Sequence, residues 1–206
     1  MKTKRNLLLI ALILSAITLP VCGQTYQAES ARLSRLLDWH AGSVVADIGA
    51  GEGEMTLDAA KSVGPTGRVY STEVNTEKLA RLKKLAAKEK DHNITVIEGS
   101  QAGTNLPPEC CDSIYMRRVY HHFTEPQKMD ASLFQSLKPG GMLAVIDFPP
   151  RSWLPPVKGV PANRGGHGMP KKILIKELTS AGFQVVSEPA DWPSNNYCVI
   201  FRKPGN

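Results

Sequence analysis

The sequence lacks a cysteine pattern that would support a disulfide framework or a metal centre. One of its four cysteines, Cys22, lies in an apolar leader, which leaves Cys110, Cys111 and Cys198 as an odd set without CxxC spacing. An odd set cannot close fully into disulfides, and adjacent cysteines bridge each other only under strain. We interpret these three residues as small, buried apolar side chains.

Strong charge, internal repeats and low-complexity tracts are also missing. The formal charge of +6 falls to +3 without residues 1–23, because they hold three of the 25 basic residues and none of the 19 acidic ones. Six basic side chains lie within residues 78–90, where the solvent-facing side of a helix accounts for them. So small a positive excess argues against a nucleic-acid partner.

A continuous apolar run long enough for a comfortable membrane span is missing as well. Three basic side chains among the first five residues precede an apolar run at residues 7–19, which is shorter than the ~20 residues of a spanning helix. The pattern is typical of a signal peptide cleaved before Gln24, and it predicts a periplasmic or secreted protein. A retained membrane anchor is the alternative, and lipidation at Cys22 is a weaker one. We therefore expect a signal peptide or anchor over residues 1–23, which would be the only contact with a membrane, and one globular domain over residues 24–206.

What the chain does contain is a strand, a glycine turn and a helix start in direct succession. Val44–Ile48 is an almost wholly apolar run, as a strand covered on both faces requires. Gly49, Gly51 and Gly53 follow at every second position, where glycine permits a sharp turn and the close approach of a ligand. The helix that begins next presents unpaired N–H groups to this turn. The stretch predicts a site for a nucleotide-type cofactor.

The spacing around the turn separates two cofactor classes. A dinucleotide fingerprint requires glycine or alanine where this chain has Glu54, and a carboxylate is a poor neighbour for a pyrophosphate. The next expected strand, residues 68–73, ends in Glu73, which can accept hydrogen bonds from the two hydroxyls of a ribose. The alternative for Glu73 is an ordinary exposed carboxylate. A nicotinamide-dependent oxidoreductase is therefore disfavoured.

Asp47 and the GxGxG run after it resemble the first motif of the class I S-adenosylmethionine-dependent methyltransferases, whose cofactor carries no phosphate. Residues 111–116, 120–123 and 137–143 look like the later motifs of the same family, in their usual order. The resemblance covers residues 30–203. It implies S-adenosylmethionine as the cofactor and an α/β, Rossmann-like, doubly wound sheet of seven strands in the order 3-2-1-4-5-7-6, with strand 7 antiparallel.

The residue pattern by itself predicts one alternating α/β unit. Apolar runs predict strands at residues 44–48, 68–73, 94–98, 111–116, 142–148, 183–188 and 197–202. Amphipathic segments predict helices at residues 26–39, 54–62, 76–90, 126–137 and 171–181. Proline and glycine predict the turns between them, among which residues 138–141 lead into the fifth strand.

The resemblance also implies which residues hold the cofactor. They are Asp47, Gly49, Gly51, Gly53, Glu73, Val74, Ser100 and Gln101. The first four would surround the methionine part, Glu73 would bind the ribose and Val74 would pack against adenine. Many family members place an acidic residue after the third strand to accept from the adenine amino group. Ser100 and Gln101 stand there in this chain and offer neutral hydrogen bonds instead.

Charged and aromatic side chains follow the fourth strand, at the edge where open α/β sheets bind ligands. They are Arg117, Arg118, Tyr120, His121 and His122, and we expect them on the acceptor side of the site. Either histidine can act as a base, since imidazole titrates near neutral pH, and a structural role is the alternative for each. We expect no metal, because adjacent side chains diverge and no set of carboxylate or cysteine ligands accompanies them.

Residues 149–168 are rich in proline and glycine and too long for a simple connection. We expect a loop over the acceptor, with Trp153, Arg164 and His167 as its contacts, and the alternative is a disordered crossover.

Together the motifs predict transfer of a methyl group to a small-molecule acceptor by in-line displacement. Such a reaction depends mainly on positioning, because the sulfonium methyl is already activated. The competing hypothesis is a non-catalytic or degenerate cofactor-binding protein at the cell envelope.

Overall fold

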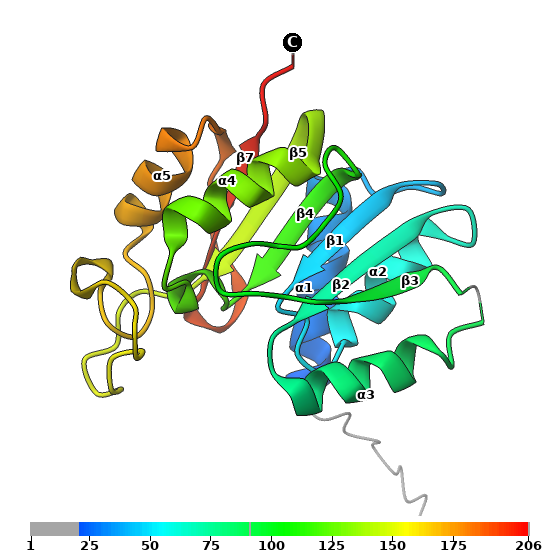
Figure 1. The fold of residues 1–206 in the computed structure, drawn as a ribbon, viewed down its shortest axis with the longest axis horizontal. Coiled ribbons are helices and arrows are strands. Elements are labelled where there is room, and N and C mark those ends of the chain that lie inside the picture. The colour runs from blue at the N-terminus through cyan, green and yellow to red at the C-terminus, as the bar shows by residue number, and fades with distance from the viewer. Residues whose placement is uncertain (1–20, 91, 206) are drawn as a thin grey trace, which may run out of the picture.

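Seven strands form one mixed sheet in the order β3-β2-β1-β4-β5-β7-β6 (Figure 1). The computed structural model describes residues 21–90 and 92–205. The strands are β1 Val44–Ile48, β2 Arg68–Glu73, β3 Ile94–Glu98, β4 Cys111–Arg117, β5 Leu137–Asp147, β6 Gln184–Ser187 and β7 Tyr197–Arg202. β7 pairs antiparallel with both β5 and β6, while the other pairs are parallel. The predicted order and the antiparallel seventh strand are confirmed.

Helices cover both faces of this sheet (Figure 1). They are α1 Val21–Leu36, α2 Glu54–Val63, α3 Thr76–Ala86, α4 Pro126–Ser136 and α5 Lys171–Ser180, joined by the 3-10 turns η1 Tyr120–His122, η2 Ala162–Arg164 and η3 Pro193–Asn195. The side chain of Asn75 accepts a hydrogen bond from the Lys78 amide at 3.0 Å and caps α3.

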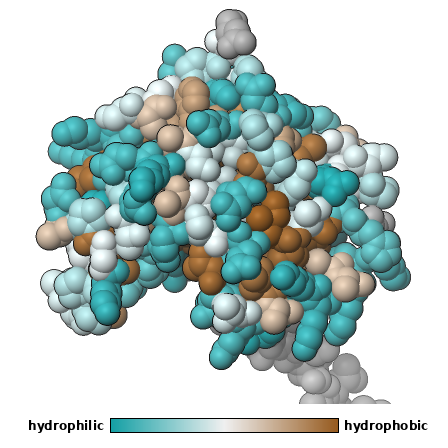
Figure 2. Space-filling model, viewed as in Figure 1, coloured by the Kyte–Doolittle hydropathy of each residue, from teal (hydrophilic) through white to brown (hydrophobic). Residues whose placement is uncertain are grey.

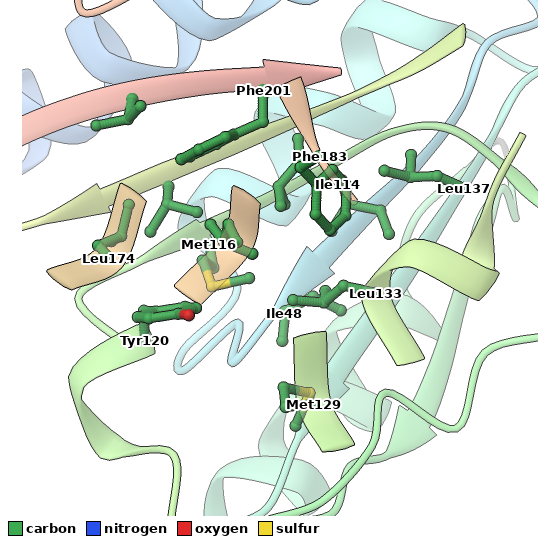
Figure 3. Packing of buried hydrophobic residues seen from close by; sticks show 14 of the residues in the cluster. Ile48, Ile114, Met116, Tyr120, Met129, Leu133, Leu137, Leu174, Phe183 and Phe201 are labelled. Carbon is green, nitrogen blue, oxygen red and sulfur yellow. The ribbon is translucent and has the colours of Figure 1, made fainter. Parts of the chain in front are cut away.

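Alternation along β4 divides the core into two layers. Ile114 and Met116 pack with α4 and α5 (Figure 3), whereas Tyr115 between them packs with α1 and α2 on the opposite face. Successive side chains of a strand point to opposite faces, so the consecutive apolar residues Ile114, Tyr115 and Met116 stabilise helix layers on both sides of the sheet.

The bounds of α1, α3 and β5 differ most from the sequence prediction. α1 begins at Val21 rather than residue 26 and ends at Leu36, and α3 ends at Ala86 rather than residue 90. The predicted turn at residues 138–141 belongs to the extended element β5. Residues 138–141 do not pair with β4: Cys111 pairs with Leu137, and the next pair is Ser113 with Met142. Gly140 and Gly141 instead form backbone hydrogen bonds with Lys203, at 3.0 and 2.9 Å.

The predicted leader falls mostly outside the described residues, since the description begins at residue 21. Within residues 21–90 and 92–205, no helix combines the length and hydropathy needed to cross a membrane.

Candidate cofactor and acceptor site

A cavity of about 500 Å³ lies at the carboxyl ends of β1, β2 and β4. β1 and β4 are adjacent in the sheet, and the chain order reverses between them, so ligands bind there in open α/β folds. Figure 2 shows the molecule hollowed along this edge, between the 149–168 loop and α3, with apolar side chains beside the hollow. A cavity therefore lies at the sheet edge where the sequence predicts the site.

The three glycines of the turn have three different surroundings. Gly49 (φ +71°) packs so closely that an added Cβ would lie 2.6 Å from the Val119 side chain. Gly51 (φ +61°) has nothing within 4 Å of that position and borders the cavity. Gly53 (φ +87°) lies outside the cavity lining, and its Cβ would meet Leu82 of α3 at 2.8 Å. Gly53 thus permits the close packing of α3, and its predicted contact with the cofactor stays a prediction.

Glu73 holds the floor of the cavity through three backbone hydrogen bonds. One carboxylate oxygen accepts from the Gly51 amide at 2.9 Å, and the other accepts from the Val74 and Asn75 amides at 2.8 Å each. The side chain is almost fully buried. Glu73 is thus a fixed carboxylate beside an open glycine, not an ordinary exposed strand end, and this arrangement suits an adenosine ribose.

Asp47 lies at the end of β1 and lines the cavity while being almost fully buried. Burial raises its pKa to about 6, against the opposing effect of the Thr56 hydroxyl, which donates to it at 2.7 Å. The same hydroxyl lies 2.8 Å from the Ser71 hydroxyl of β2. α2 and β2 therefore fix this carboxyl group beneath the glycine turn.

The remaining cofactor candidates border the same cavity. Val74 is half exposed, and Ser100 and Gln101 lie on the loop after β3. The Ser100 hydroxyl donates to the carbonyl of Gly103 at 3.0 Å, so it acts first as a turn residue. At the rim, Arg81 forms a bidentate pair with Glu52 (2.8 and 2.9 Å), which offsets one carboxylate of the glycine turn.

α1 contributes a wall that the sequence prediction missed. Tyr26 lines the cavity, and the guanidinium of Arg117 lies 4.5 Å from the centre of its ring. Arg117 also donates to the fully buried carboxylate of Glu29, which accepts from Trp192 at 3.0 Å and from Asn196 at 3.2 Å. Arg117 therefore lines the cavity but is bound to α1.

Arg118 is the second predicted acceptor contact that lines the cavity. Its backbone is left-handed (φ +56°), and its Nε donates to the side-chain oxygen of Asn196 at 3.0 Å. Burial and the neighbouring Arg117 lower its pKa, and the guanidinium nevertheless stays positively charged.

The two adjacent histidines have opposite environments. His121 is buried, and its Nδ1 lies 2.9 Å from Asp147, which also accepts from the His121 amide at 3.1 Å. Its Nε2 is buried without a hydrogen-bond partner in the described part of the chain. His122 lines the cavity and is exposed, and the centre of its ring lies 4.1 Å from that of His121. This packing buries part of the ring and, with His121, lowers the pKa of His122 to about 4.

Three predicted acceptor contacts lie elsewhere. Tyr120 is fully buried and its hydroxyl lies 3.0 Å from both Asp130 and Glu177. Arg164 is 1% exposed, pairs with Glu177 at 3.0 Å, and donates to the carbonyls of Phe123 and Tyr120. Trp153 is 75% exposed and outside the cavity lining. We expected these polar and aromatic groups to face a ligand, but the first two stabilise the fold and the third faces solvent.

The 149–168 loop reaches the cavity through other residues. Val157 and Lys158 line it, and the Val157 amide donates to the Gly166 carbonyl at 3.0 Å. His167 lies behind them, with its ring 5.4 Å from His121 and 6.1 Å from His122. The loop thus forms part of the cavity wall, through Val157 and Lys158 and not through Trp153, Arg164 or His167, and its contact with an acceptor stays a prediction.

No group of three or more His, Cys, Asp or Glu side chains is arranged to hold a metal ion in residues 21–90 and 92–205. The side chains at the cavity that could bind a metal are four carboxylates and one histidine, His122, and they are not gathered into one ligand set, so the cavity suits an organic cofactor.

A family model described as a methyltransferase domain matches residues 39–174. The chain is 30% identical over 109 residues to the ubiquinone/menaquinone biosynthesis C-methyltransferase UbiE of a Marinomonas species, covering 52% of this chain and 43% of that protein. It is 34% identical over 113 residues to UbiE of Salmonella arizonae, with the same coverage. The chain thus spans less than half the length of these relatives.

Solved structures share the fold over most of the chain. An S-adenosylmethionine-dependent methyltransferase from Aquifex aeolicus has a TM-score of 0.71 at 24% identity, covering 85% of this chain and 89% of that one. The [4+2]-cyclase SpnF also has a TM-score of 0.71, at 16% identity, covering 87% of this chain and 82% of that one. The fold alone therefore does not determine the reaction, whereas the family match and the site agree: the chain belongs to the class I S-adenosylmethionine-dependent methyltransferases, with S-adenosylmethionine as its cofactor.

Proposed function

We propose that this chain methylates a small-molecule acceptor bound between η1, α1 and the 149–168 loop. When bound, S-adenosylmethionine supplies a methyl group on a positively charged sulfur, which an in-line nucleophile can displace. Cofactor and acceptor must share one cavity of about 500 Å³, which leaves room for a compact acceptor and not for a macromolecule.

The juxtaposition of two chemically different walls carries this proposal. Gly51 and Glu73 offer an open turn and a fixed carboxylate to the cofactor on one side. On the other side His122 offers a base and Arg118 a cation to the acceptor, while Arg117 lines the wall paired with Glu29. Such positioning is the main contribution of an enzyme to an already activated methyl group.

His122 is the group best suited to take a proton from the acceptor. Because its pKa lies near 4, its ring is neutral at physiological pH and has a free nitrogen lone pair for a proton, although it is a weaker base than an ordinary histidine. His121 acts through it: Asp147 fixes the His121 ring, and that ring packs on His122. His121 is thus a positioning residue in this proposal, and His122 the candidate base.

Turnover of S-adenosylmethionine with an acceptor library tests the function. The names of the UbiE relatives make a quinone precursor the first acceptor to assay, with release of S-adenosylhomocysteine as the readout. Tight binding of S-adenosylmethionine without turnover on any acceptor would favour the non-catalytic alternative.

We also propose that residues 1–23 direct export or anchor the domain in a membrane, because basic residues precede a short apolar run there. Fractionation of tagged protein, with intact mass of the recovered chain, tests this. A full-length chain in the cytosolic fraction would contradict it.

A further inference from the structure

Cys110 and Cys111 lie at the amino end of β4, whereas the cavity lies at its carboxyl end. A strand rises about 3.3 Å per residue, so the seven residues of β4 separate the two places by ~20 Å. Nothing in the methyl-transfer proposal uses these thiols.

The two sulfur atoms are only 3.1 Å apart. Adjacent side chains of a regular strand point to opposite faces, so this contact requires an irregular backbone. Two irregularities flank it: Glu109 is left-handed (φ +48°), and the register of β4 with β5 shifts between Cys111 and Ser113. Cys110 is partly exposed and Cys111 is buried.

A disulfide does not suit this pair. Adjacent Cα atoms are about 3.8 Å apart across a trans peptide, whereas disulfides usually span about 4.4–6.8 Å. A single atom bonded to both sulfurs suits it better. With thiolate bonds of about 2.3 Å, a separation of 3.1 Å corresponds to a bond angle of about 85° at the bridging atom.

This angle discriminates between kinds of centre. With the same bond length, a tetrahedral centre would hold the sulfurs about 3.8 Å apart and a linear one about 4.6 Å apart. A pyramidal, three-coordinate centre with angles near 90° matches instead. Within the described residues no third His, Cys, Asp or Glu joins the pair, so the third substituent must come with the ligand.

The surroundings make Cys110 the attacking thiol. A hydrogen bond from the Cys111 thiol, helped by the Lys138 ammonium, lowers the pKa of Cys110, although burial and Asp112 oppose this. The hydrogen bond with Cys110 and then burial raise the pKa of Cys111, which therefore follows as the second thiol.

We propose that Cys110 and Cys111 form a dithiol site for a trivalent, soft main-group centre that carries one organic substituent, with organic arsenic(III) as the representative class. Two S–H bonds break and two sulfur–arsenic bonds form, while the oxide oxygen leaves with both thiol protons as water. Arsenic stays trivalent, so no oxidant or reductant is needed.

The test is titration of the reduced, full-length protein with phenylarsine oxide, followed by intact mass spectrometry. We expect one adduct per chain that a dithiol removes and an equal concentration of monothiol does not. Cys110→Ser and Cys111→Ser should each lose this resistance to monothiol, whereas Cys198→Ser should keep it, since Cys198 lies buried on β7.

Thermal unfolding of each variant separates loss of the site from loss of the fold, and Cys110→Ser is decisive because its side chain is partly exposed. An adduct that a monothiol removes, no adduct at all, or a dithiol-type adduct that survives in folded Cys110→Ser would each overturn the proposal. S-adenosylmethionine affinity should stay within about twofold for the adduct, since the cavity lies at the other end of β4.

Discussion

Replacing Glu73 by alanine is the sharpest test of the cofactor site. The carboxylate accepts three backbone hydrogen bonds, from Gly51, Val74 and Asn75, and it borders the cavity where we expect the ribose. The substitution removes the expected acceptor for the ribose hydroxyls and also the group that holds the Gly51 amide in place. Affinity and stability should therefore both fall, by amounts that can be separated.

The expected loss of affinity for S-adenosylmethionine follows from the negative charge of the Glu73 carboxylate, which accepts hydrogen bonds from the ribose. A hydrogen bond to a charged group contributes about 1.5–3 kcal/mol, which corresponds to roughly a 10- to 150-fold rise in Kd. The freed amides of Val74 and Asn75 lie beside the exposed start of α3, where water can reach them, so we expect a stability loss of only ~1 kcal/mol, or a fall in Tm of about 2–4 °C.

Calorimetric titration with S-adenosylmethionine measures the affinity, and thermal unfolding measures the stability. Glu98→Ala is the matched control, because Glu98 is paired with Glu73 in the register of β2 and β3 but is exposed and outside the cavity lining. Equal Kd values for the wild type, Glu73→Ala and Glu98→Ala would remove Glu73 from the cofactor site.

Three further predictions test the other parts of the site and the core. Gly53→Ala should lower stability by about 1–3 kcal/mol, by strain at φ +87° and contact with Leu82, yet leave the cofactor Kd of the folded protein nearly unchanged in calorimetry. The rate with a found acceptor should be flat from about pH 7 to 8 and fall toward pH 4 as first Asp47, with a pKa of about 6, and then His122 gains a proton; His122→Gln should lack the lower of these two steps. Burial raises the pKa of Asp130 to about 7, so its contribution to the free energy of unfolding is complete below the ordinary carboxyl pKa of about 3.9 and is lost as pH rises through 7. In urea unfolding, the stability of Asp130→Asn should therefore decline less over this range than that of the wild type, and an equal decline would refute this.

The sheet and the cofactor side of the cavity were predictable because they depend on local signals. The apolar run of β1, the glycines after it and the acidic end of β2 are each set within a few residues, and the family resemblance supplied the strand order. The packing of Gly53 was not, since it depends on a contact with Leu82 on a later helix.

The acceptor side was less predictable because distant residues determine it. Arg164 is a residue type that often binds ligands, but here its guanidinium donates to Glu177 and to the carbonyls of Tyr120 and Phe123. Tyr26 belongs to no recognisable motif. It lines the cavity because α1 is held in place by the buried Glu29 on the same helix. No pattern within the loop distinguishes Val157 and Lys158 from their neighbours.

The anchoring of Arg164 separates the stem of the 149–168 loop from its tip. The stem is fixed to α5 through Glu177 and to η1 through two carbonyls, while Val157 and Lys158 at the cavity make no such ties through their side chains in the described structure. Under the proposed function, changes at Val157 and Lys158 should alter which acceptor is admitted at little cost in stability. One or two substitutions there would then change the range of acceptors without rebuilding the domain that carries the cofactor.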